Sequence, residues 1–195
     1  MAYSTKWLGI GILLVSVLCG ISLGVAHKSS QSVGNQRDKS TLRKIYDEDQ
    51  ESKNDDSRRL WRARVRQLIA EDKVQTGEDY YYAAFIFQHG QKPEEYLYAH
   101  VLAMTAVGKG FEPAKWLAAA TLDRYLRSVK QPQIFGTQFG SLFDDGDLDP
   151  YNKELLSDKM RQLWCVAPFS KQVKIQDDMK AGKDFSSTRI CPIPN

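Results

Sequence analysis

The sequence has little excess charge of either sign. Its 27 Lys and Arg residues are nearly balanced by 24 Asp and Glu residues, which leaves a formal net charge of +3 on 195 residues. The basic residues are scattered among acidic ones, so the concentrated positive surface typical of nucleic-acid-binding proteins is not predicted. Hydrophobic residues make up 42% of the chain and charged residues 26%, which indicates a folded domain rather than a disordered one. We therefore expect one domain of ordinary size and no nucleic-acid partner.

Motifs of the common catalytic and metal sites are also missing. The chain has no phosphate-binding P-loop, no G-x-S-x-G nucleophile elbow and no H-E-x-x-H zinc motif. The acidic residues Asp145, Asp147 and Asp149 suggest a calcium loop, but Pro150 and Leu156 occupy the positions that require Gly and Glu. We therefore predict no metal site and no cofactor.

Cysteine is scarce, with three residues in the chain. Cys19 lies within an apolar run, so Cys165 and Cys191 are the pair that remains. Two interpretations stay open for this pair. A disulfide would suit a small domain in an oxidising compartment. The alternative is two unrelated thiols, one beside Trp164 in a core and one near the C-terminus.

Charge is absent altogether from residues 7–26. About 20 residues are enough to cross the hydrocarbon core of a membrane as a helix. Residues 1–27 are therefore predicted to be a transmembrane anchor or a signal peptide, and the length of the apolar run favours the anchor. The membrane is then a partner through residues 7–26. Residues 28–40 are polar and predict a flexible linker, followed by a single helical domain over residues 41–195.

Glycine and proline divide the apolar residues 79–139 into three predicted helices. Gly is common just after a helix, and Pro is common in the first turn of the next one. The first helix ends at His89 and Gly90, the second begins at Pro93, and the third begins at Pro113. Short connections make consecutive helices antiparallel. The fold class is therefore predicted as mainly α, an antiparallel helical bundle similar to the hairpins of helical-repeat proteins, although no fixed-period repeat is present.

Two weaker helical patterns precede this bundle. Residues 41–56 are mostly charged and predict a short solvated helix. Ser57 is the predicted cap of the next helix. That helix has apolar residues at i, i+4, i+7 and i+8, and its five arginines are interpreted as a solvated face.

The pattern changes after Pro132. Ile134, Phe135, Thr137 and Phe139 favour extended structure, and residues 144–147 contain a turn signal. We expect a short extended segment or a β-hairpin here, with residues 148–151 as the returning strand. Two further helices are expected downstream, one capped by Ser157 or Asp158 and one over residues 170–181.

Two histidines lie on neighbouring predicted helices. His89 ends the first helix, and His100 lies midway along its antiparallel partner. Helical rise alone places their rings about 9 Å apart, which is too far for both to bind one metal ion. A lone helical His is more often a structural residue, and His89 at a helix C-terminus is favoured by the helix dipole when charged.

Asp123 and Arg124 interrupt an otherwise apolar helix. Neighbouring helical residues point about 100° apart, so at least one of these two must face another element and find partners there. The candidates are Gln133, Thr137 and Gln138, which a chain reversal at Pro132 brings back. Two interpretations remain open: a polar clamp that ties this segment to the bundle, or a ligand site in which Arg124 binds an anion and Asp123 or His89 acts as a base.

Four short segments carry a family resemblance. They are Glu48-Asp49-Gln50, Gln88-His89-Gly90, Leu122-Asp123-Arg124 and Gln133-Ile134-Phe135-Gly136-Thr137-Gln138. In order and spacing they resemble an uncharacterised bacterial family with the pattern D-Q, Q-H, D-R and Q-x-[YF]-G-T-Q, over about residues 46–139. That family has no settled activity, so the resemblance implies a domain and a site rather than a reaction. It implies that the following residues converge: Asp49, Gln50, His89, Asp123, Arg124 and Gln138.

Two functions are weighed on these observations. The leading hypothesis is a binding or interaction module for a protein partner or a small polar ligand, with these ligand-binding candidates: Asp49, Gln50, Arg124, Gln133, Thr137 and Gln138. The alternative is an extracytoplasmic hydrolase-like enzyme with His89, Asp123 and Arg124 as its catalytic candidates. We expect the chain in the bacterial inner membrane with one span and a periplasmic domain, or secreted after signal cleavage.

Overall fold

The computed structural model describes residues 41–52, 54–140, 147–184 and 187–192. All of them belong to one compact unit, Asn35–Asn195. The predicted anchor or signal peptide at residues 1–27 and the linker at residues 28–40 lie outside this part of the chain. Within the described ranges, no helix combines the length and the apolar character that crossing a membrane requires.

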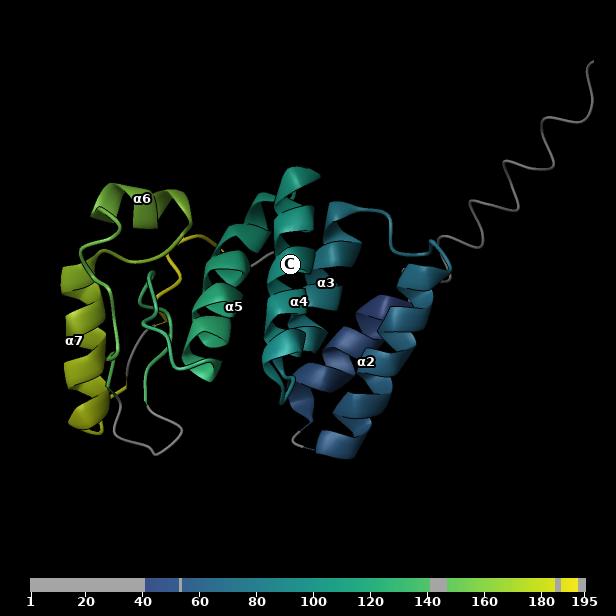
Figure 1. The fold of residues 1–195 in the computed structure, drawn as a ribbon, viewed down its shortest axis with the longest axis horizontal. Coiled ribbons are helices and arrows are strands. Elements are labelled where there is room, and N and C mark those ends of the chain that lie inside the picture. Colours follow the sequence, from purple (N-terminus) through teal and green to yellow (C-terminus); the bar gives the residue numbers. More distant parts are fainter. Residues whose placement is uncertain (1–40, 53, 141–146, 185–186, 193–195) are drawn as a thin grey trace, which may run out of the picture. The chain divides into compact units, whose positions relative to one another are not determined.

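The described chain is mainly helical, as predicted. Residues 41–51 form the first described helix. It is followed by α2 (Asp55–Ala70), α3 (Gly77–Gln88), α4 (Pro93–Gly108), a 3-10 turn η1 (Glu112–Ala114), α5 (Lys115–Ser128), α6 (Asp158–Leu163) and α7 (Phe169–Lys180) (Figure 1). α4 packs against α3 on one side and α5 on the other. The short connections between these three helices produce the predicted bundle of consecutive helix pairs.

Local sequence signals explain where the helices begin. Thr76 and Asp79 form a capping box at the start of α3, in which each side chain accepts a hydrogen bond from the other residue's backbone N–H. Pro93 occupies the first turn of α4, where a missing N–H costs nothing. The cap of α2 is Asn54 rather than the predicted Ser57, because the Asn54 side chain accepts the Ser57 N–H at 3.0 Å.

Small residues bring the central helices close together. Ala83, Ala84, Ala99 and Ala103 are fully buried where α3 and α4 pack. The largest buried side chains of the same core include Tyr81, Phe87, Leu68 and Leu117. The helix at residues 41–51 is more than a solvated helix, since Leu42 and Ile45 are buried in this core.

The described residues form no β-hairpin after the third core helix, unlike the prediction. Described residues 131–140 contain no strand, and their only ladder contact is one isolated parallel bridge between Gln133 and Tyr151. The physical reason lies in Asp123, whose carboxylate accepts the backbone N–H groups of Ile134, Phe135 and Thr137. Those N–H groups are therefore unavailable to a second strand. The extended-segment alternative holds, and most of the predicted turn at residues 144–147 lies outside the described chain.

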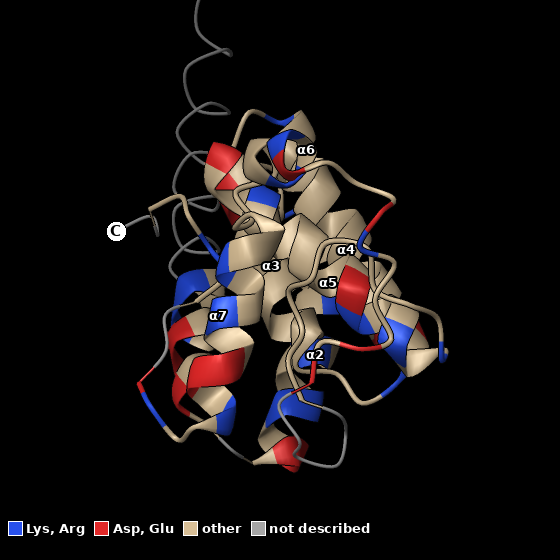
Figure 2. Cartoon of the chain, turned by 90° about the vertical axis from the view of Figure 1, so that its left-hand side faces the viewer, with Lys and Arg blue, Asp and Glu red and all other residues tan. Residues whose placement is uncertain are grey.

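The C-terminal part packs against this extended segment. Phe135, Ala119 and Val166 form a second small apolar cluster, bordered by Trp164. A disulfide joins Cys165 and Cys191, whose Cα atoms are 5.2 Å apart. Figure 2 shows acidic and basic segments close together along α7, which matches the mixed charge pattern of its sequence.

Candidate functional site

Asp123 is the centre of one polar network. It lies in α5 and is completely buried. One carboxylate oxygen accepts the N–H groups of Ile134 and Phe135, at 2.8 and 3.0 Å. The other accepts both the N–H and the hydroxyl of Thr137, at 3.0 and 2.8 Å. Burial raises the pKa of the Asp123 carboxyl, and these four donors oppose the rise by stabilising the carboxylate.

Arg124 extends this network to the end of α3. Its guanidinium donates to the backbone carbonyl of Gln88 at 2.6 Å and to the side-chain oxygen of Gln138 at 3.2 Å. Gln138 in turn donates to the Ala120 carbonyl. Burial lowers the pKa of the Arg124 guanidinium. The two contacts direct its donors into the protein and toward the C-terminal carbonyls of α3.

The extended segment contains hydrogen bonds between its own two ends, and side chains from later in the chain contact it. The buried Gln133 amide accepts the Gln138 N–H and donates to the Gln138 carbonyl, at 3.0 and 2.9 Å. Gly136 has φ +79°, and a Cβ atom there would clash with the Gln172 side-chain oxygen. Gln172 and Tyr151 both donate to the Phe135 carbonyl. The predicted clamp between Asp123-Arg124 and the Gln133–Gln138 segment is thus present.

Asp49 and His89 form a second polar group. Asp49 is fully buried, and its carboxylate lies 2.6 Å from His89 Nδ1. Because an ionised carboxylate only accepts, Nδ1 carries the hydrogen, and a neutral ring then has its lone pair on Nε2. The His89 side chain is 21% exposed, so solvent reaches the ring. Gln50 also donates to Asp49, at 3.2 Å.

Arg58 lies beside this pair without completing it. Its Nε atom is 3.6 Å from the second Asp49 oxygen. Both atoms are buried and lack a hydrogen-bond partner among the described residues. The ion pair with Arg58 is the compensation that the described residues offer this oxygen for its lost hydration, and a buried carboxylate oxygen without a hydrogen bond is unusual. Asp49 therefore differs from Asp123, whose two oxygens are fully satisfied.

The two groups meet at the C-terminal end of α3. Arg62 from α2 donates to the His89 carbonyl at 3.2 Å, and Arg124 from α5 donates to the neighbouring Gln88 carbonyl. Two cations thus bind the last carbonyls of the helix, where its dipole is negative. The resemblance implies that six residues converge. The structure divides them into Asp49, Gln50 and His89 on one side and Asp123, Arg124 and Gln138 on the other.

His100 takes no part in either group. Its Nδ1 atom lies 2.9 Å from the Ala118 carbonyl in α5, which is a structural contact between helices. Among the residues that the structure describes, no cluster of three or more His, Cys, Asp or Glu side chains is close enough to hold a metal ion.

The sequence did not predict that several polar residues are buried. The charge pattern of α2 predicts a solvated face for Arg62, yet Arg62 is only 5% exposed and pairs with Glu95 at 2.8 Å. Gln172 and Arg161 are also buried, and they hold the Tyr151 hydroxyl behind the extended segment. No local motif marks these residues. The one usable signal is the i, i+4, i+8 spacing of Arg58, Arg62 and Arg66, which places them on one face of α2.

The fold and these contacts define a helical domain with two charge-centred polar groups, one sealed and one reachable by solvent. Comparison with protein-family models, with curated proteins and with solved structures found no match for the chain. The resemblance to the bacterial family with the D-Q, Q-H, D-R and Q-x-[YF]-G-T-Q pattern stays a prediction.

Proposed function

We propose that this chain is a binding module, tethered to the bacterial inner membrane by residues 7–26 and carrying its helical domain in the periplasm. Its ligand is a small polar molecule or a protein partner. The observation that supports this proposal is the sealed state of the Asp123 network. Asp123 is fully buried with four donors, and Arg124 directs its donors to Gln88 and Gln138. Groups that act on a substrate must come within hydrogen-bond reach of it, and Asp123 is not accessible for that.

The disulfide agrees with a periplasmic location. Disulfides persist in oxidising compartments and are rare in the cytosol. The bond between Cys165 and Cys191 ties the C-terminal segment to the residues just before α7. If the apolar run is instead removed as a signal peptide, the same domain is secreted.

A second candidate function, a hydrolase-like enzyme, is favoured by the Asp49–His89 pair. A buried carboxylate that orients a partly exposed imidazole is the arrangement of many general bases. In that case His89 takes a proton from the attacking water, and the neighbouring cation is Arg58 rather than Arg124. The catalytic residues would then differ from the set predicted from sequence.

One experiment separates the two candidates. The full chain in detergent is incubated with ester, phosphoester and amide substrates, and in parallel with a panel of small polar ligands monitored by thermal unfolding. We expect no turnover and a raised midpoint temperature with at least one ligand, because a ligand that binds only the folded state stabilises it. Turnover that His89→Gln abolishes and His100→Gln retains would establish the enzyme instead.

A further inference from the structure

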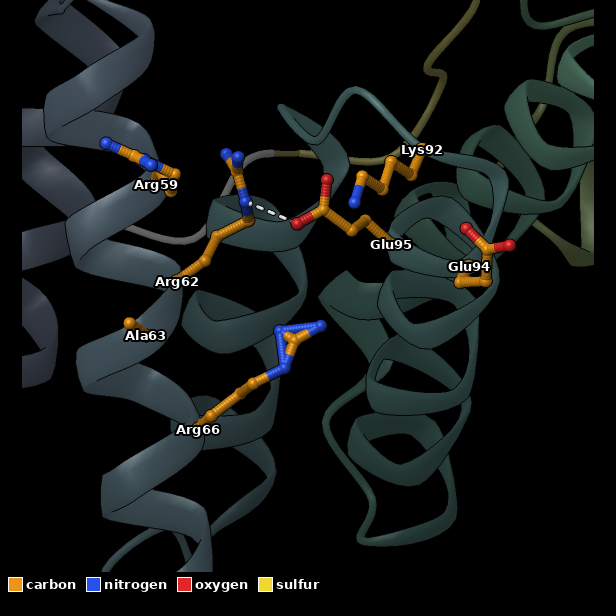
Figure 3. Close-up of a pocket in the computed structure, with 7 residues that line it drawn as sticks. All are labelled: Arg59, Arg62, Ala63, Arg66, Lys92, Glu94 and Glu95. Atoms are coloured by element: carbon orange, nitrogen blue, oxygen red, sulfur yellow. Dashed lines mark hydrogen bonds and ion pairs between the residues drawn. The ribbon is translucent and has the colours of Figure 1, made fainter.

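A pocket lies between α2 and the beginning of α4, and none of the residues that line it belongs to the Asp123 network. Its volume is about 540 Å³, within the range of roughly 300–1,000 Å³ typical of small-molecule sites. The lining contains four cationic and two anionic side chains, and one of the cations, Arg59, pairs with Asp56 outside the lining at 3.2 Å. The lining residues are Arg59, Arg62, Ala63 and Arg66 from α2, and Lys92, Glu94 and Glu95 from the other side (Figure 3).

An ion pair joins two of the side chains that line this pocket. Arg62 and Glu95 are joined at 2.8 Å, with side chains only 7% and 16% exposed. Glu95 also accepts the Gln91 N–H at 2.9 Å. Desolvation works against the charged form, but the Gln91 N–H and Arg62 outweigh it and lower the pKa of the Glu95 carboxyl. Arg62 and Glu95 are therefore occupied with each other.

Arg66 is positioned but not paired. Its guanidinium lies 4.6 Å from the ring centre of Phe87 and 5.5 Å from that of Tyr98. Stacking on aromatic rings fixes a guanidinium while its N–H edge stays available. Figure 3 shows Arg66 extending from α2 toward α4, below the Arg62–Glu95 pair. Within the described ranges, Arg66 has neither an ion pair nor a hydrogen-bond acceptor, although it carries five N–H donors.

Lys92 is a second cation of the same kind. It is exposed at the rim of the pocket, on the turn before α4. It too forms no ion pair with the described chain. Two elements that are distant in sequence thus each present an unneutralised cation to one pocket.

We propose that this pocket binds a phosphate group, with Arg66 as its main contact and Lys92 as the second. The inference rests on the proposed binding function and names the ligand class. A phosphate monoester carries a charge of about −1.5 to −2, which matches the two unpaired cations of the lining, Arg66 and Lys92, better than the single charge of a carboxylate does. Its several oxygens accept the fork of Arg66 and the ammonium of Lys92 together. The phosphate belongs either to a soluble small molecule or to a lipid headgroup at the membrane.

The first test uses inorganic phosphate as the probe and the full chain in a neutral detergent. Calorimetric titration is compared for the unmodified chain, Arg66→Gln, Lys92→Gln and the control Arg64→Gln. Arg64 lies on the same helix, donates to Gln67 and does not line the pocket. We expect Arg66→Gln to weaken phosphate binding by about tenfold or more, since a charge-assisted hydrogen bond is lost. Lys92→Gln should weaken it less, and Arg64→Gln should leave it unchanged.

A second test distinguishes the two sources of phosphate without any substitution. The Arg66 Nε–H resonance of the full chain is followed by NMR in nanodiscs of phosphatidylcholine, with glycerol phosphate in solution or with phosphatidic acid in the bilayer. A shift with glycerol phosphate supports a soluble ligand, and a shift with phosphatidic acid alone supports a headgroup. No shift with either, or equal loss of affinity in Arg66→Gln and Arg64→Gln, overturns the phosphate site. His89-dependent turnover would overturn the proposed function and leave this result standing.

Discussion

At the scale of single residues, two buried aspartates behave differently because their surroundings differ. Asp123 meets four donors and organises a backbone segment. Asp49 meets His89 and Gln50 and keeps one oxygen without a hydrogen bond in the described chain. A fully satisfied buried carboxylate stabilises a local structure, whereas an incompletely satisfied one still has an acceptor oxygen without a hydrogen bond.

The Asp123 network predicts a large loss of stability for Asp123→Asn. An Asn side chain has one acceptor oxygen, so its NH₂ group would face backbone N–H donors that also need an acceptor. We expect the free energy of unfolding to fall by about 2–3 kcal/mol, measured by urea denaturation. Asp177→Asn on the exposed side of α7 serves as the control and should change it by less than about 0.5 kcal/mol. Equal effects of the two substitutions would contradict the clamp.

The Arg62–Glu95 pair predicts a specific response to acid. The pKa of Glu95 is lowered in the folded chain, so the folded state favours the ionised carboxylate. This stabilisation is fully present above the ordinary pKa of 4.5 and is lost as the pH falls through the lowered pKa. Between about pH 5 and pH 3, the free energy of unfolding should therefore fall more steeply in the unmodified chain than in Glu95→Gln. Glu94→Gln, at the exposed neighbour, should keep the steep fall.

At the scale of elements, helix ends and one tight segment carry much of the local specificity. α3 begins at a reciprocal cap and ends at two arginines, so both of its polar ends are satisfied by side chains. The segment from Gln133 to Gln138 has no regular structure and depends on α5 and α7 for its conformation. The start of α3 is therefore determined by residues close to it in the sequence. The conformation of the segment from Gln133 to Gln138 is determined by contacts with other elements.

The capping box predicts a moderate loss for Thr76→Ala. The substitution removes the acceptor of the Asp79 N–H at the start of α3. Loss of such a cap costs about 1 kcal/mol of unfolding free energy, which chemical denaturation can measure. Thr105→Ala is a suitable control, because the Thr105 hydroxyl donates to Val101 within α4 and Ala has the higher helix propensity. If Thr105→Ala lowered the unfolding free energy as much as Thr76→Ala does, the capping box would make no specific contribution to stability.

Two glycines with positive φ allow backbone strain to be separated from steric exclusion. Gly136 has φ +79° and lies against the Gln172 side chain. Gly182 has φ +65°, and no atom lies within 4 Å of the position that an alanine methyl group would take there. Gly182→Ala should cost about 1 kcal/mol from the left-handed conformation alone. Gly136→Ala should cost at least about 2 kcal/mol more, because the Gln172 amide must move from the Phe135 carbonyl. Thermal or urea unfolding of both variants checks the difference.

At the scale of the whole described unit, the C-terminal tail connects parts that are distant in sequence. Thr188 accepts a hydrogen bond from the Trp116 indole at the start of α5, and Arg189 donates to the Pro113 carbonyl. The disulfide holds this tail to Cys165. The tail therefore links the central bundle to the region of α6 and α7.

Removal of the disulfide should weaken this link without unfolding the bundle. The double substitution Cys165→Ala and Cys191→Ala removes a disulfide between residues 26 positions apart, which corresponds to about 3.5 kcal/mol of unfolding free energy. We expect hydrogen exchange to increase in the tail and in α6, while the buried amides of α3 and α4 remain protected. Unprotected α3 and α4 amides in the double variant would show that the bundle depends on the tail.

The sequence by itself determined the mainly helical fold, the order of the three core helices and the need of Asp123-Arg124 for partners, with Gln133, Thr137 and Gln138 as candidates; the structure shows that these contacts form a clamp. The predictions from sequence depend on signals within a few residues, such as caps, Gly and Pro positions, and a charge in an apolar helix that must find a partner. Tertiary structure alone decided that His89 pairs with Asp49 rather than Asp123, that Arg62 is buried, and that Asp123 takes the N–H groups a hairpin needs. Those outcomes follow from which helix faces meet, and helix faces meet through packing between residues far apart in the chain.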